Sequence, residues 1–102
     1  MERTKELEKK IKDEIYGFFA EQCDVNIEDL NDETNIIEDI SGDSLMFLQL
    51  LQSWKRDYGI DIDFRKIGKY MTKNPAETIG KTIVFAMLVI FEKEKFLELV
   101  EA

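Results

Sequence analysis

The chain of 102 residues is long enough for one domain, and its 44% hydrophobic residues can supply that domain's core. The sequence contains no histidine, which excludes serine–histidine and cysteine–histidine catalysis as well as histidine metal ligands. A single cysteine, Cys23, cannot close an internal disulfide, so we expect a reducing, cytoplasmic location and no redox role. We expect no signal peptide, and the longest apolar run, Ile83 to Phe91, is too short for stable membrane insertion.

The net charge of −8 is concentrated in one segment of the chain. Residues 24–43 carry eight acids and no base, and the rest of the chain carries 14 acids and 14 bases. Residues 55–81 are even basic, with seven bases against four acids. Because a polyanionic segment repels phosphate backbones, we do not expect nucleic acid as a partner. The acidic segment is either a solvated loop or a docking surface for a basic partner.

The first half of the chain predicts two helices separated by a long loop. Residues 5–22 repeat apolar side chains at helical spacing and predict an amphipathic helix. Residues 24–43 lack any sustained period and predict a loop held in place by its aliphatic residues. A second helix is predicted from Ser44 to about Tyr58, with Gly59 as its C-terminal stop.

The second half predicts a short helix followed by a longer apolar one. Residues 60–73 begin with alternation and then predict a short helix. Asn74-Pro75-Ala76-Glu77 has the pattern of an N-cap, a proline at the first helical position and a capping glutamate, so the last helix is expected to begin at Pro75. Its stretch 83–91 is apolar all round, which predicts burial on every side. Residues 92–95 interrupt this pattern, and either one helix or two can follow.

Two chemical interpretations of the motifs fail. A calcium-binding EF-hand loop starting at Asp29 would need glycine and glutamate where Thr34 and Ile40 stand, so no metal site is expected. The stretch 42–45 resembles the motif of a serine hydrolase family, but the chain has no histidine to take the proton of Ser44. The alternative role for Ser44 or its neighbour Asp43 is to cap the second helix.

The order of these parts resembles the acyl carrier proteins. An amphipathic helix, a long acidic loop ending in Asp-Ser-Leu, a helix closed by aromatic-Gly-Ile-x-Ile and further helices match that family from Ile11 to Ile90. The most specific motif is Ile40-Ser41-Gly42-Asp43-Ser44-Leu45. The resemblance implies an all-α, four-helix bundle in which Ser44 accepts a 4′-phosphopantetheine group from coenzyme A and Asp43 is the flanking motif acid. Ser44 would then be a substrate of a separate transferase, which agrees with the missing base.

The resemblance also suggests further site residues and a division of the chain. Candidates for the lining of an acyl chain are apolar residues on and beyond the second helix: Phe47, Leu48, Leu51, Ile62, Ile67 and Met71. Candidates for docking partner enzymes flank the serine: Glu38, Asp39, Leu45, Met46 and Gln49. We expect a carrier domain over residues 1–91 and an amphipathic helical extension of the same domain over residues 92–102.

The function implied is that of a carrier and not of an enzyme. Its partners would be a phosphopantetheinyl transferase and enzymes that transfer or modify acyl groups held as thioesters, in a fatty acid, lipid or polyketide-type pathway. Met46, expected to be exposed, Gln49 and Lys55-Arg56 replace the acids common on this helix in the family, which suggests a specialised pathway. The alternatives are a peptidyl or aminoacyl carrier and an unmodified interaction module. Residues 83–91 could fold back on the core or form a homodimer.

Overall fold

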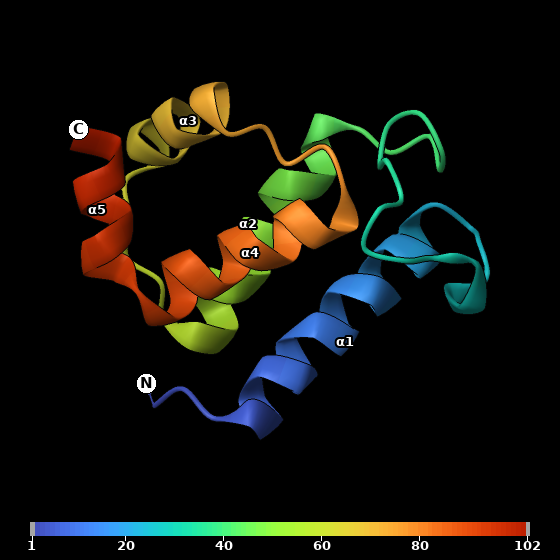
Figure 1. Ribbon diagram of the computed structural model, residues 1–102, viewed down its shortest axis with the longest axis horizontal. Helices are drawn as coiled ribbons and strands as arrows, with labels where there is room; N and C mark the ends of the chain where they lie inside the picture. The colour runs from blue at the N-terminus through green and yellow to red at the C-terminus, as the bar shows by residue number, and fades with distance from the viewer. Residues whose placement is uncertain (1, 102) are drawn as a thin grey trace.

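The computed structural model describes residues 2–101, which form five α-helices and one short 3-10 turn and contain no strand. The predicted all-α fold is therefore confirmed (Figure 1). The elements in chain order are α1 (Lys5–Gln22), η1 (Ile27–Asp29), α2 (Ser44–Tyr58), α3 (Phe64–Lys73), α4 (Ile79–Phe91) and α5 (Lys93–Glu101). None of these helices is long and apolar enough to cross a membrane.

The first helix has the bounds that its periodicity predicts. The Thr4 side chain accepts a hydrogen bond from the Leu7 N–H at 3.0 Å and so caps the N-terminus of α1. The apolar face of α1 buries Ile11, Ile15 and Phe19 completely. This face packs on α4, so α1 forms one side of the core (Figure 1).

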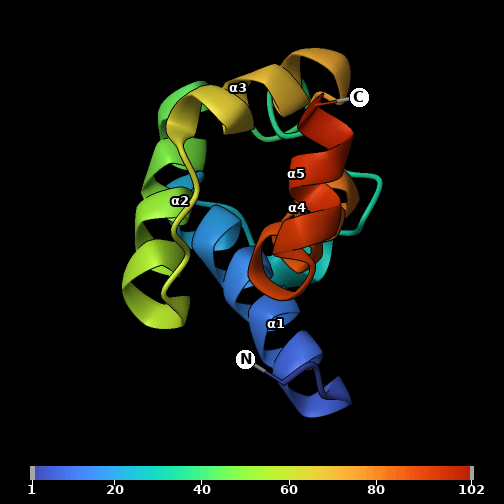
Figure 2. The same cartoon turned by 90° about the vertical axis from the view of Figure 1, so that its left-hand side faces the viewer.

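The core is centred on an aromatic cluster between the last four helices. The Phe85 ring of α4 lies 6.0 Å from that of Trp54 in α2, 5.6 Å from Tyr70 in α3 and 6.1 Å from Phe96 in α5. Such centroid distances are typical of favourable aromatic pairs. In Figure 2, α3 spans the upper end of the molecule between α2 and α5. One aromatic cluster thus joins the last four helices of the chain.

The predicted start of the last helix at Pro75 is wrong. Asn74 ends α3 instead, because both its backbone N–H and its side-chain amide donate to the Tyr70 carbonyl. The carbonyl of Glu77 accepts a hydrogen bond from the loop residue Ile36, which keeps the segment extended. Helix α4 begins only at Ile79, and the Thr78 side chain is its N-cap.

The apolar run 83–91 is not buried on every side. Phe85, Ala86, Leu88 and Val89 are buried between α1 and the other helices, whereas Val84 is 59% exposed. The chain leaves the helical conformation at Glu92 and forms a second helix, α5. Of the two arrangements predicted around residues 92–95, one helix or two, the structure therefore has two.

Candidate functional site

Ser44 is the first residue of α2, and the Asp43 side chain is the N-cap of that helix. The Oδ1 atom of Asp43 accepts a hydrogen bond from the Leu45 N–H at 3.0 Å. Of the two residues that sequence reasoning offered as the cap, the structure selects Asp43. Ser44 itself is exposed, and within residues 2–101 its hydroxyl makes no hydrogen bond. The Ser44 hydroxyl is therefore available to an outside reagent.

The long acidic loop is fixed to the start of α4, which sets the position of Ser44. An isolated antiparallel bridge pairs Asn35 with Thr78. The backbone bonds beside it run from Ile36 N to Glu77 O at 2.9 Å, from Ile79 N to Thr34 O at 3.1 Å and from Gly80 N to Asp32 O at 2.9 Å. A segment that looks like a free loop in sequence is thus held by backbone hydrogen bonds on both sides of one bridge.

Two glycines permit the close packing of this loop. A Cβ atom added at Gly42 would lie 2.5 Å from Cγ2 of the fully buried Ile36, and the Gly42 N–H donates to the Ile36 carbonyl at 2.7 Å. A Cβ at Gly80 would lie 2.8 Å from the carbonyl oxygen of Asp32. The buried Ile36 is one of the aliphatic residues predicted to hold the loop in place. Sequence reasoning missed Gly80 as a positioning residue, since no residue near it in sequence signals its close approach to Asp32.

Four of the five predicted docking residues are exposed. Glu38, Asp39 and Gln49 are exposed, and Leu45 is 64% exposed. Met46, in contrast to its expected exposure, is half-buried because its Sδ atom packs 3.8 Å from the Sγ atom of Cys23.

Five of the six candidate lining residues belong to the core or pack against it. Leu51 and Ile67 are buried in the core, and Phe47, Ile62 and Met71 are half-buried and pack against the core. Leu48 is 47% exposed and lies outside this cluster.

The electrostatics near Ser44 suit an attached anion and do not activate the neighbouring thiol. The first turn of α2 contains no acidic residue, and the Asp43 cap stands directly before it, at the positive end of the helix dipole. Burial, and secondarily the charge of Asp43, raise the pKa of the Cys23 thiol, which disfavours the reactive thiolate. An exposed hydroxyl at the N-terminus of α2, which has 15 residues, fits a phosphodiester group.

Residues 2–101 contain no group of three or more metal-ligating side chains of the His, Cys, Asp and Glu types.

Comparison with known proteins agrees with this geometry. Residues 13–79 match the family model described as a phosphopantetheine attachment site. The chain is 44% identical to an acyl carrier protein homolog of Clostridium acetobutylicum, a match that covers 91% of this chain and 89% of that protein. It is 30% identical to an acyl carrier protein of Picosynechococcus sp., with 55% of this chain and 69% of that protein covered. It is 36% identical to one of Desulforapulum autotrophicum, with 51% and 68% covered.

No solved structure matches the chain significantly. The family match includes the whole of α2 and the loop that positions it, and the Clostridium relative covers almost the full chain. The exposed serine, its capping aspartate and these matches lead to one conclusion. This chain belongs to the acyl carrier protein family, and its cofactor is 4′-phosphopantetheine.

Proposed function

We propose that Ser44 bears the 4′-phosphopantetheine arm and that the chain shuttles acyl groups as thioesters. The observation that carries this proposal is the exposed, unbonded Ser44 hydroxyl at the start of α2, inside the matched region. The chain has two other serines. Ser53 donates its hydroxyl to the Leu50 carbonyl at 2.7 Å, and Ser41 lies outside any helix with a φ of 58°. Ser44 therefore fits the attachment best.

The attachment needs little from this chain beyond a positioned hydroxyl. The Ser44 Oγ atom attacks the phosphorus that carries the pantetheine half of coenzyme A, and an Oγ–P bond forms. The bond from that phosphorus to the bridging oxygen breaks, and adenosine 3′,5′-bisphosphate leaves. The hydroxyl proton passes to a base of the transferase, since this chain has no histidine to accept it. Asp43 supports the reaction by fixing the first turn of α2.

Once attached, the arm supplies a thiol that holds an acyl group, and this chain supplies apolar surface for that group. We assign the inner lining to Phe47, Leu51, Ile62, Ile67 and Met71, because all five lie in or against the core. Leu48, nearly half exposed, would contribute only outside the core. Each CH₂ group of the cargo that becomes buried contributes about 0.8 kcal/mol, which offsets the free-energy cost of a modest opening of the bundle.

Docking of partner enzymes is assigned to the surface formed by Glu38, Asp39, Leu45, Met46 and Gln49. Within this surface the acids come from the loop and the exposed apolar area from Leu45. Helix α2 has no acid before Asp57, which supports dedicated enzymes in a specialised fatty acid, lipid or polyketide-type pathway. The chain itself would be a cytoplasmic carrier and not an enzyme.

The extension 92–102 is proposed to belong to the same domain as residues 1–91. Its residue Phe96 is completely buried, and its ring lies 5.2 Å from that of Tyr70. Most of the apolar run 83–91 is likewise covered by its own chain, with the exposed Val84 as the exception. We therefore propose a monomer, with the homodimer through 83–91 as the alternative.

The test is the intact mass of the purified protein after incubation with coenzyme A and a broad-specificity phosphopantetheinyl transferase. We expect the gain of one phosphopantetheine in the wild type and in Ser41→Ala, and none in Ser44→Ala. A folded wild-type protein that several transferases leave unmodified would contradict the proposal and favour an unmodified interaction module. Loading with an amino acid in preference to an acyl chain would instead identify a peptidyl or aminoacyl carrier.

A further inference from the structure

A basic surface lies on α3 of this otherwise acidic protein. Between Phe64 and Ala76 the chain has four bases and no acid, although its net charge is −8. We call this surface the α3 basic face and define it by Arg65, Lys66, Lys69 and Lys73. Its charge has the opposite sign to that of residues 24–43, so the molecule presents two regions of different polarity.

The fold places these bases in solvent because the other side of α3 is used for packing. Ile67 is buried, and Tyr70 and Met71 are half-buried against the core. On the opposite side, the Arg65 side chain is 91% exposed, and Lys69 is exposed as well. The short helix therefore presents a basic face and not a mixed one.

The stability of α3 does not account for this arrangement. Arg65, Lys69 and Lys73 follow one another at a spacing of four residues, where like charges repel. Arg65 and Lys66 stand in the first turn, next to the positive end of the helix dipole, and only Lys73, in the last turn, is favoured by the dipole. The carboxylate of Asp63 offsets only part of this electrostatic repulsion, through an ion pair with Arg65 at 3.3 Å.

Two of the four bases lack an acidic partner in the described part of the chain. Within residues 2–101, neither Lys69 nor Lys73 forms an ion pair, and Lys66 reaches Glu101 only at 3.8 Å. Elsewhere the lysines divide in the same way: Lys9 pairs with Asp13 at 2.8 Å, whereas Lys93 and Lys95 of α5 form no ion pair within residues 2–101. The unpaired charges of α3 are therefore available to carboxylates of another molecule.

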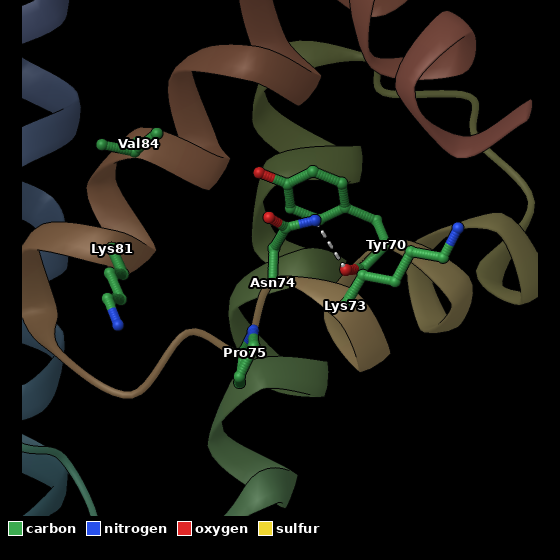
Figure 3. A pocket seen from close by; sticks show the side chains of 6 residues that line it. All are labelled: Tyr70, Lys73, Asn74, Pro75, Lys81 and Val84. Atoms are coloured by element: carbon green, nitrogen blue, oxygen red, sulfur yellow. Dashed lines mark hydrogen bonds between the residues drawn. The ribbon is translucent and has the colours of Figure 1, made fainter. Parts of the chain in front are cut away.

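The surface is hollowed on both sides of Lys73. One hollow of about 330 Å³ lies between α3 and α4, and Figure 3 shows Lys73 and Lys81 on either side of Asn74 and Pro75 there. A second hollow is lined by Lys66, Lys69 and Lys73 together with Val100 and Glu101 at the end of α5, so that three bases there face one acid. Protruding acidic side chains of a partner could enter these hollows and meet lysines there.

Helix α3 and the N-terminal end of α2 both lie in the upper part of the molecule, with α3 to the left of the start of α2 in Figure 1 and extending from the top of α2 in Figure 2. We propose that the α3 basic face docks an acidic surface patch of the enzymes that act on the arm, an inference that rests on the proposed function of Ser44.

The partner's chemistry follows from the acids around Ser44. A membrane or a nucleic acid that covered this end would also meet Asp39 and Asp43, both exposed, and would be repelled by them. A protein can present carboxylates opposite α3 alone. Charge complementarity of this local kind favours an acidic protein patch.

The first experiment follows backbone amide NMR signals of the full chain during titration with a short polyglutamate peptide. We expect saturable shifts confined to residues 64–73 and to Lys81, weakened by salt. Lys69→Glu combined with Lys73→Glu should weaken binding about tenfold. The matched control, Lys93→Glu combined with Lys95→Glu, makes the same change of charge on exposed residues of α5 and should leave the affinity unchanged.

Four outcomes would overturn the assignment. Shifts spread equally over the lysines of α1 and α5, or an equal loss in the control variant, would show a general charge effect. Tighter binding to phosphatidylglycerol vesicles than to polyglutamate would identify a membrane as the partner of α3. Tighter binding to duplex DNA than to polyglutamate would identify a nucleic acid as that partner.

A second experiment links the surface to Ser44. A broad-specificity transferase with an added polyglutamate tail should show a lower KM for the wild type than the untailed enzyme, with kcat unchanged, and no such gain for the Lys69→Glu, Lys73→Glu protein. If neither enzyme modifies Ser44, the proposed function fails. If both modify it and the tail has no α3-dependent effect, only the docking inference fails.

Discussion

Asp43 stabilises the site through a single hydrogen bond from the Leu45 N–H to its Oδ1 atom at 3.0 Å. The same carboxylate also helps to raise the pKa of the Cys23 thiol, although burial is the larger cause. A capping hydrogen bond needs an acceptor oxygen but no charge, so the two effects of Asp43 can be separated by substitution.

Replacement of Asp43 tests this separation. Asp43→Ala removes the cap and should lower the free energy of unfolding by about 1 kcal/mol, measured by urea denaturation. Asp43→Asn keeps a capping oxygen and should stay near the wild-type stability. Equal losses in both variants would show that the charge, and not the hydrogen bond, stabilises α2.

Two tyrosines make the stability depend on pH in the alkaline range. Burial, and then the hydrogen bond to Asp32, raise the pKa of Tyr16 to about 12. Burial and the hydrogen bond to Glu14 do the same for Tyr58. Because the folded protein holds these protons more tightly than the unfolded chain, whose phenol pKa is about 10, the stabilisation is complete below pH 10 and is lost as the pH rises toward 12.

The measurement is the urea midpoint across this range of pH. The wild type should lose stability more steeply than a Tyr16→Phe, Tyr58→Phe double variant, in which only the remaining groups titrate. The prediction fails if the two proteins show the same slope, or if the phenolate absorbance of the folded wild type develops entirely near the pKa of free tyrosine.

At the scale of elements, local signals predicted the helices and failed where distant contacts decide the backbone. The bounds of α1 and the left-handed Gly59 after α2, with a φ of 65°, follow from periodicity and a stop residue. The start of α4 does not follow from local signals, because the Glu77 carbonyl accepts a hydrogen bond from the N–H of Ile36, which lies far away in sequence. Asn74 does cap a helix, but it caps the C-terminus of α3 and not the N-terminus of α4.

The packing of α5 provides a prediction at this scale. Phe96 is fully buried, with its ring 5.2 Å from Tyr70 and 6.1 Å from Phe85. Phe96→Ala should therefore lower the free energy of unfolding by about 3–5 kcal/mol, a large part of a domain's total. The control Leu99→Ala, on a residue that is 46% exposed in the same helix, should change it much less. Similar effects of both variants would show that α5 is not part of the core.

At the scale of the whole molecule, the order of elements and the Asp-Ser-Leu motif were sufficient to predict the fold class and the family. They could not predict how the loop packs, since the bridge between Asn35 and Thr78 and the close approach at Gly80 join segments that are distant in sequence. For the same reason the predicted exposure of Met46 was wrong: Met46 contacts Cys23, the C-cap residue of α1, which lies outside the motif.

Burial of the apolar run 83–91 within its own chain leads to a prediction for the molecule in solution. The molecular mass measured by light scattering should stay that of one chain from dilute to concentrated solution, because α1 and α5 already cover α4. A mass that rises toward two chains, and that Val84→Lys returns to one, would establish the homodimer instead.

The most direct test of the account is to locate the arm by fragmenting the modified protein in a mass spectrometer. Fragments that separate Ser41 from Ser44 should carry the added phosphopantetheine on Ser44 alone, since Ser44 is the exposed serine at the start of α2. Added mass on Ser41 or Ser53, or none on a folded protein that active transferases have been given, would contradict the central claim.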